Sequence, residues 1–130
     1  MSDAFDGRPR RGSRGRDLPI DQAAVTLAEA KALSPRVERE ARRILECASD
    51  LTRVKIVRAL METPLAASDL ARVVGRSAAA TSQHTRVLRE VGAVTAARSG
   101  NVIRYRMSRE PNAVALEAIA RSFDLLAKRE

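Results

Sequence analysis

Side chains suited to binding an anionic partner gather in one quarter of the 130-residue chain, between Arg76 and Arg109. This stretch holds seven arginines and one acidic residue, Glu90, so it carries +6 of the formal net charge of +8. The planar guanidinium group of arginine donates two parallel hydrogen bonds to phosphate or to guanine. The concentration favours an electrostatic footprint for a polyanion over the alternative, an arginine-rich surface that only provides solubility. The arginines are Arg76, Arg86, Arg89, Arg98, Arg104, Arg106 and Arg109.

The same stretch contains a predicted helix over 78–91, with Ser77 as its cap and Gly92 as its terminator. At 1.5 Å per residue the helix is about 20 Å long, which suits a major groove. One face is predicted to pack on the body of the protein through Thr81, His84 or Thr85, Leu88 and Val91. The small alanines at its start let the backbone approach a groove floor, and a glutamine can pair bidentately with adenine. The outward face carries Ala79, Ser82, Gln83, Arg86 and Arg89.

Cys47 and His84 are the only residues of their types. His84 falls within the predicted helix, where packing or a hydrogen bond to phosphate is favoured over catalysis. Cys47 is predicted to be a small buried side chain, because free cysteine packs like a hydrophobe. The alternative is a thiol switch, which would require oxidation without an internal disulfide or pairing across a dimer.

The N-terminal part of the chain supplies a tail and the first helices. Residues 1–17 are rich in Gly, Arg and Ser and are predicted to be a disordered basic tail, with a DNA-contacting arm as the alternative. Residues 18–130 are predicted to form one domain. Helices are expected over 21–33, from Pro35 onward, and from Asp50 to Pro64. Their inward residues are predicted to be Val37, Ala41, Ile44, Leu45, Ala48, Val54, Val57, Leu60 and Met61.

The next stretch predicts a helix-turn-helix followed by a β-hairpin. Ser68 is expected to cap a short helix over 69–74, which turns Leu70 and Val73 inward and ends at Gly75. Two strands then follow, over 94–98 and 102–107, joined by a three-residue turn at 99–101. Along the second strand, inward Ile103, Tyr105 and Met107 alternate with outward Arg104 and Arg106.

A last helix is expected after Pro111, with apolar residues at steps of three, four and three. Such a narrow seam is typical of helix–helix association between subunits, and packing within one subunit is the alternative. The seam consists of Leu116, Ile119, Phe123 and Leu126. Together the elements predict a mainly α fold with a small β-hairpin, a winged helix-turn-helix.

Composition excludes several other classes. Aromatic residues make up only 2%, which argues against single-stranded nucleic acids, whose bases stack on exposed rings. The single cysteine fits a reducing compartment, and no apolar run approaches a membrane span or a signal-peptide core. We therefore expect a cytoplasmic protein without a membrane partner. An enzyme is disfavoured, because no phosphate-binding glycine loop and no acid–base pair stands out.

The segment SDLARVVGRSAAATSQHTRVLREVGAVTAARSGNVIRYRM, with the preceding ASDLTRVKIVRALME, resembles the ArsR/SmtB (arsenic-repressor-like) regulators. The resemblance covers roughly 39–128 and implies a dimer joined through the first and last helices of each subunit. It also implies DNA contacts from Ser77, Ala79, Ser82, Gln83, Arg86, Arg98, Asn101 and Arg104. Thr81 and Thr85 depart from the aliphatic residues usual at their places.

The resemblance does not extend to metal sensing. Metal-sensing members carry a cysteine pair where this chain has 65–69, or histidine and acidic ligands on the last helix. Neither site can be built here, because the chain has one cysteine and one histidine and 111–130 contains neither. We expect no metal and no cofactor, and the effector is not indicated.

The prediction is a transcriptional repressor that binds an inverted repeat of double-stranded DNA as a homodimer. Two alternatives remain at this point. One is a nonspecific architectural DNA binder, and the other is a winged helix used for protein interaction.

Overall fold

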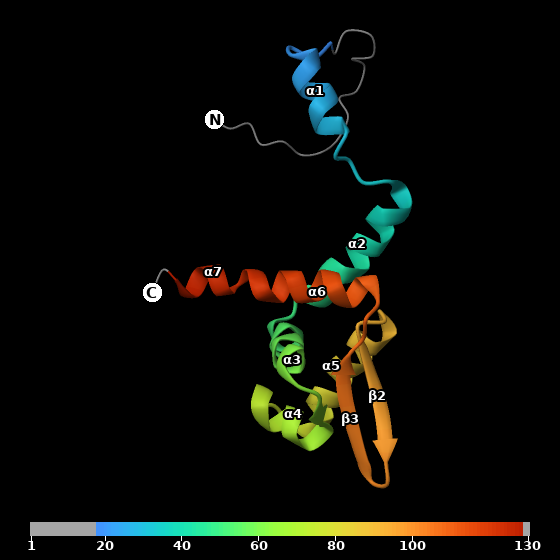
Figure 1. Cartoon of the computed structure of the whole chain (residues 1–130), viewed down its shortest axis with the longest axis vertical. Helices are drawn as coiled ribbons and strands as arrows, with labels where there is room; N and C mark the ends of the chain where they lie inside the picture. Colours follow the sequence, from blue (N-terminus) through green and yellow to red (C-terminus); the bar gives the residue numbers. More distant parts are fainter. Residues whose placement is uncertain (1–17, 129–130) are drawn as a thin grey trace. The chain divides into compact units, whose positions relative to one another are not determined.

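The computed structural model describes residues 18–128, and internal contacts divide the chain into two units with the boundary between Ser34 and Pro35. The described part of the first unit contains one helix, α1 (Gln22–Glu29) (Figure 1). Asp21 caps this helix, because its carboxylate accepts a hydrogen bond from the N–H of Ala24 at 3.0 Å. The helix is shorter than the predicted 21–33. The predicted tail, 1–17, lies outside the described residues, and the 18–130 domain stays a prediction.

The second unit contains the predicted helix-turn-helix and hairpin (Figure 1). Its elements are α2 (Pro35–Ala48), α3 (Leu51–Glu62), β1 (Leu65–Ala66), α4 (Ala67–Val74), α5 (Ala78–Glu90), β2 (Val94–Ser99), β3 (Val102–Met107), α6 (Pro111–Ser122) and α7 (Asp124–Ala127). Helix α3 is central, since it packs against α2, α4, α5, α6 and β3. Within 18–128, no helix combines the length and apolar character that crossing a membrane requires.

Local sequence signals account for most helix ends. Pro35 occupies the first position of α2, and Asp50 caps α3 by accepting from the N–H of Arg53 at 3.2 Å. Gly75 closes α4 with a φ of 71°, a backbone conformation that favours glycine. These predicted boundaries are confirmed. The predicted Ser68 cap is wrong, because strand β1 leads directly into α4 and leaves Ala66 as its N-cap, without a side-chain bond.

The sheet has three antiparallel strands in the order β1-β3-β2, so a third, two-residue strand extends the predicted hairpin. Leu65 pairs with Tyr105 at the added edge. In the hairpin, Ser99 pairs with Val102, which leaves a two-residue turn in place of the predicted three. Gly100, the first turn residue, takes a φ of 62°, as a tight hairpin turn requires.

The core forms where the inward faces of α2 to α6 meet Tyr105 of the sheet. Its most completely buried side chains include Ile56, Leu70 and Leu88. Three predicted inward residues are wrong, since Leu45 is 61% exposed, Val73 is 60% exposed and Val37 is 36% exposed. In α2 the buried positions are Ile44 and Cys47, and in α4 they are Leu70, Ala71 and Val74. The helical step of about 100° per residue turns Leu45 and Val73 away from those positions.

Candidate nucleic-acid interface

Helix α5 separates a buried face from a polar, exposed one. Thr81, Thr85 and Leu88 are buried, and His84 and Val91 are partly buried, which confirms the predicted inward face. The side chains on the opposite face are exposed, namely Ala79, Ser82, Gln83, Arg86 and Arg89. The helix can therefore offer a continuous polar surface to a partner without unfolding.

The start of α5 is fixed by its cap. The Ser77 hydroxyl oxygen accepts a hydrogen bond from the N–H of Ala80 at 3.1 Å, so the predicted cap is confirmed. Alanine occupies the first three positions of the helix, and the first two are exposed. Because the first N–H groups of a helix lack intrahelical partners, this end favours negative charge, such as a phosphate.

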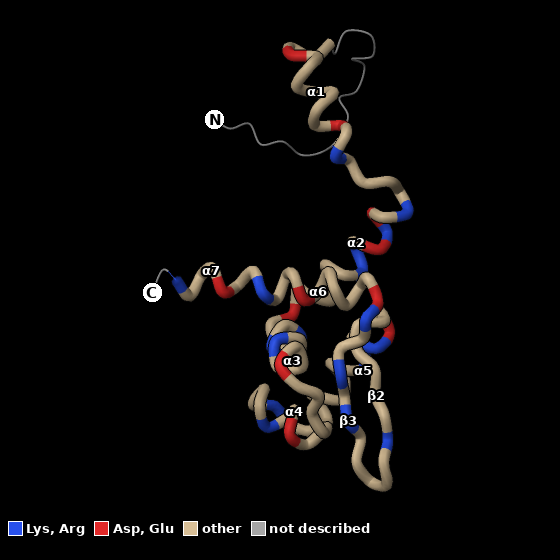
Figure 2. The backbone as a smooth tube through the Cα atoms, in the orientation of Figure 1, with Lys and Arg blue, Asp and Glu red and all other residues tan. Residues whose placement is uncertain are grey.

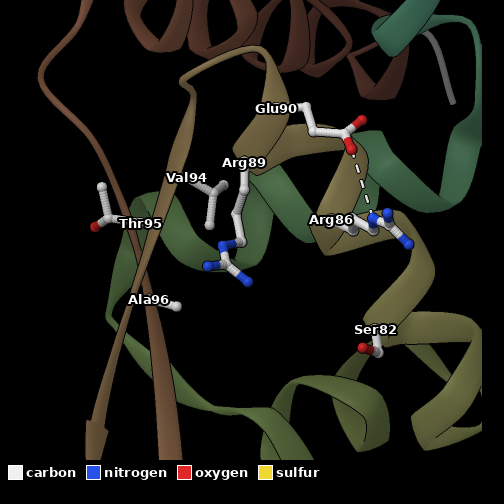
Figure 3. A pocket seen from close by; sticks show the side chains of 7 residues that line it. All are labelled: Ser82, Arg86, Arg89, Glu90, Val94, Thr95 and Ala96. Carbon is white, nitrogen blue, oxygen red and sulfur yellow. Dashed lines mark ion pairs between the residues drawn. The ribbon is translucent and has the colours of Figure 1, made fainter.

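A groove of about 650 Å³ separates the outward face of α5 from strand β2 (Figure 3). Arg89 reaches into the space between the two elements, whereas Arg86 turns to Glu90 and forms an ion pair at 3.4 Å. Both partners of that pair are mostly exposed, so solvent screens it and a phosphate can compete for Arg86. The groove is lined by Ser82, Arg86, Arg89, Glu90, Val94, Thr95 and Ala96.

Arg89 was placed on the outward face by its spacing but was absent from the predicted DNA contacts. Its position, three residues after Arg86 and one helical turn along the same surface, was the available signal. The structure adds that it borders the groove beside the hairpin. Arg89 is therefore a candidate contact to the DNA phosphate backbone, at a position between α5 and the β2–β3 hairpin, which forms the wing.

Arginines occur along both strands of the hairpin (Figure 2), and the strand register assigns them to two faces. Arg104 and Arg106 are exposed and flank the buried Tyr105, as predicted. Arg98 pairs with Ile103, whereas Ala97 pairs with Arg104, so Arg98 and Arg104 stand on opposite faces of the ribbon. Asn101 is exposed at the turn. The hairpin therefore offers an arginine to a partner on each of its two faces.

The two threonines on the buried face of α5 differ in hydrogen bonding. The hydroxyl of Thr85 donates to the carbonyl oxygen of Ser82 at 2.9 Å. That of Thr81 is buried and has no hydrogen-bond partner among the described residues. Thr85 thus fits the polar helix surface locally, and Thr81 is the less favourable of the two departures from aliphatic residues.

His84 connects α5 to the start of α3. Its Nδ1 lies 3.9 Å from Oδ1 of Asp50, the cap of α3. Burial alone would raise the pKa of Asp50, but the N–H of Arg53 and the charges of His84 and Arg53 hold it below its ordinary value. These contacts favour the packing interpretation of His84.

Cys47 is 1% exposed and lies in the core beneath α3 and α6. Burial raises the pKa of its thiol, although the nearby guanidinium of Arg53 acts in the opposite direction. Since the thiolate is the reactive form, this setting favours the packing interpretation over a thiol switch. Within 18–128, no group of three His, Cys, Asp or Glu side chains is arranged to hold a metal ion.

The predicted seam of the last helix is divided between the core and the surface. Leu116 is 3% exposed and packs inside its own domain, and Ile119 is partly buried. Phe123 is 42% exposed and Leu126 is 59% exposed. Only the second half of the seam is therefore available to another subunit.

Helix, glycine turn, outward-facing second helix and hairpin define a winged helix-turn-helix domain. Residues 50–96 match the family model of bacterial regulatory proteins of the arsR family. A solved chain described as a possible transcriptional regulator for arsenical resistance is 33% identical, with a TM-score of 0.51, and the match covers 67% of this chain and 95% of that one. The chain belongs to the ArsR family of regulators.

Two further solved structures share the fold. The transcriptional repressor BigR from Xylella fastidiosa is 27% identical, with a TM-score of 0.59, and the match covers 68% of this chain and 90% of BigR. The homodimeric winged helix-turn-helix DNA-binding domain of Mb0332 from Mycobacterium bovis is 20% identical, with a TM-score of 0.62. That match covers 77% of this chain and 95% of the Mycobacterium bovis domain.

Proposed function

We propose that this protein is a transcriptional repressor that binds an inverted repeat of duplex DNA as a homodimer in the cytoplasm, without a catalytic step. The observation that carries the proposal is the exposed polar face of α5, which borders a groove toward the hairpin. Membership of a family of bacterial regulatory proteins supports the proposal.

In this proposal α5 enters a major groove and divides its work along its length. Ser82 and Gln83 read base edges, and the exposed Ala79 lets the helix backbone come close to them. Ser77 holds the helix start, whose N–H groups face a phosphate, and Arg86 contacts DNA further along. Arg86 exchanges its Glu90 partner for a phosphate or a base, which its exposed ion pair permits.

The hairpin supplies contacts that position the protein on DNA without reading its sequence. Arg104 and Asn101 approach the backbone or the minor groove beside the site, and Arg98 does so from the other face of the ribbon. With few base-reading side chains, part of the preference comes from the shape of the DNA.

The dimer interface is proposed at the C-terminal end of α6 and at α7. Phe123 and Leu126 are exposed there, as is Leu125, whose side chain is 64% exposed. A second copy would cover these apolar side chains, and the Mycobacterium bovis domain of the same fold is homodimeric. Two reading helices would then meet successive major grooves, so half-sites should lie about 10–11 base pairs apart. Ile119 lies at the edge of this interface, and Leu116 supports it from within the core.

Selection from random duplex DNA, followed by sequencing of the bound fraction, tests the proposal. A repeat with turn-length spacing is expected, bound by a dimer in sedimentation. Salt-sensitive retention without an enriched motif would instead support an architectural DNA binder. Absence of retention would support a protein-interaction module, for which exposed Leu45 and Val73 offer apolar contacts.

A further inference from the structure

The C-terminal end of α5 is held by side chains from two other helices. The last carbonyl groups of a helix lack intrahelical partners and need other donors. Here Arg43 of α2 donates from Nη2 to the carbonyl oxygen of Glu90 at 3.1 Å. Asn112 of α6 donates from Nδ2 to the carbonyl oxygen of Val91 at 2.8 Å. These bonds span 47 and 21 residues of sequence, so they tie distant elements to one point.

One carboxylate joins the two donors. Glu40 accepts from Asn112 at 3.1 Å and from Nη1 of Arg43 at 3.3 Å and 3.2 Å. The hydrogen bond from Asn112 and then that from Arg43 lower the pKa of Glu40 below its ordinary value. The carboxylate therefore stays ionised at neutral pH and orients both side chains toward the end of α5.

The wing starts from the same point. Gly92 follows the helix with a φ of 80°, and its carbonyl oxygen accepts from the hydroxyl of Ser108 at 2.6 Å. The N–H of Ser108 donates to the carbonyl oxygen of Ala93 at 2.8 Å. Helix α5, the proposed reading helix, and the hairpin are thus anchored together. The anchor lies where Arg43 connects the end of α5 to α2 and Asn112 connects it to α6.

We propose that Arg43 and Asn112 are positioning residues that set the angle of the reading helix relative to α6, and thereby the half-site spacing that a dimer accepts. The inference rests on the proposed function, because α6 carries part of the proposed dimer interface. Neither residue belongs to the predicted DNA-reading surface. Their effect on DNA therefore passes through the orientation of α5.

The test compares full-length Arg43→Met, Asn112→Leu and the conservative Arg43→Lys with the wild type. Arg42→Met is the matched control, because Arg42 is an exposed arginine on the same helix and its loss changes the charge equally. Affinities are measured for the repeat that the wild type selects, for the same repeat with one base pair added to or removed from its spacer, and for a random duplex.

The wild type is expected to prefer the selected spacing. Arg43→Met and Asn112→Leu should reduce that preference at least fivefold while binding to the random duplex changes less than twofold. Arg42→Met should match the wild type, and Arg43→Lys should retain part of the spacing preference that Arg43→Met loses. An unchanged preference in Arg43→Met and Asn112→Leu would overturn the proposal, even if all affinities fell together, because a general loss of stability has that signature.

Amide hydrogen exchange provides a readout that does not depend on DNA. The hydrogen bonds from Arg43 and Asn112 to the end of α5 are together called the α5 clamp. Loss of this clamp should accelerate amide exchange in residues 88–93 at least fivefold relative to α4. If the wild type selected no repeat, the proposed function would fail. The exchange rates would still decide whether Arg43 and Asn112 hold this helix, and rates unchanged by both substitutions would refute that.

Discussion

Helix α5 has the faces that its sequence predicts, whereas the apolar seam that begins in α6 does not form the single surface that was predicted. In α5, polar residues separate the two sides, so the buried Leu88 and the exposed Gln83 are assigned correctly. The seam that begins in α6 was predicted as one surface, but Leu116 of α6 is buried in the core, whereas Phe123, directly after α6, is exposed. A helix with a clear polar boundary thus reveals its environment, whereas an apolar seam does not show whether its own domain or a partner covers it.

Substitutions at the two ends of the seam should have different effects on unfolding, and the largest expected loss of stability is at Leu116. Leu116→Ala should lower the free energy of unfolding by about 2–5 kcal/mol, because it leaves a cavity in the core. Phe123→Ala should instead weaken dimerisation, seen as a stability loss that depends on protein concentration. Urea unfolding at several concentrations checks both. Identical concentration dependence in the two variants would remove the distinction.

On α5, substitutions at the cap should change stability, whereas substitutions on the outward face should change DNA preference. Ser77→Ala should lower the free energy of unfolding by about 1 kcal/mol, because the N–H of Ala80 loses its acceptor. Ser82→Ala, at an exposed position, is the control and should leave stability unchanged while altering DNA preference. Thermal unfolding and competition binding measure the two effects. A loss of stability in the control would show that the two roles are not separate.

The wing should act on every DNA sequence alike. Arg104→Ala should reduce the magnitude of the slope of log affinity against log salt by about 1, as expected for one lost phosphate contact. Gln83→Ala should leave that slope unchanged, since glutamine carries no charge. Titrations at several salt concentrations decide this. An equal reduction in both variants would contradict the separation of helix and wing.

The smallest expected effect concerns the cap of α3. The pKa of Asp50 is depressed in the folded protein, so its contribution to stability is present above the ordinary carboxylate pKa. That contribution is lost as the pH falls through the lower, folded value. Asp50→Asn keeps a capping side chain but removes the titration, so stability should fall less steeply below about pH 4. Unfolding measured from pH 7 down to pH 3 tests this, and parallel curves would contradict it.

The helices and strands of this chain are easier to predict from its sequence than the neighbours that each element packs against. Ser77, Gly75 and Pro35 act within a few residues of their own backbone, so the sequence was sufficient to place the helix ends they mark. Strand β1 was missed because two residues carry no alternation, and its pairing of Leu65 with Tyr105 joins segments 40 residues apart. The α5 clamp was missed for the same reason, since Arg43 and Asn112 meet the helix end only after folding.

The candidate site shows the same limit. The outward face of α5 followed from helical periodicity, but the separation of Arg98 from Arg104 depended on strand register. A turn of two residues instead of three changes which residues pair across the hairpin. Arg89 was correctly placed on a face, but the groove beside it required the position of β2.

The central claim is that the exposed face of α5 reads bases, and a base-pair scan tests it most directly. Each position of the selected repeat is changed in turn, and binding is compared between the wild type and Gln83→Ala. The account predicts that the substitution abolishes discrimination at one base pair in each half-site, worth about 1–3 kcal/mol, and leaves the other positions unchanged. A uniform loss across all positions would contradict it, because Gln83 would then contribute to affinity without reading sequence.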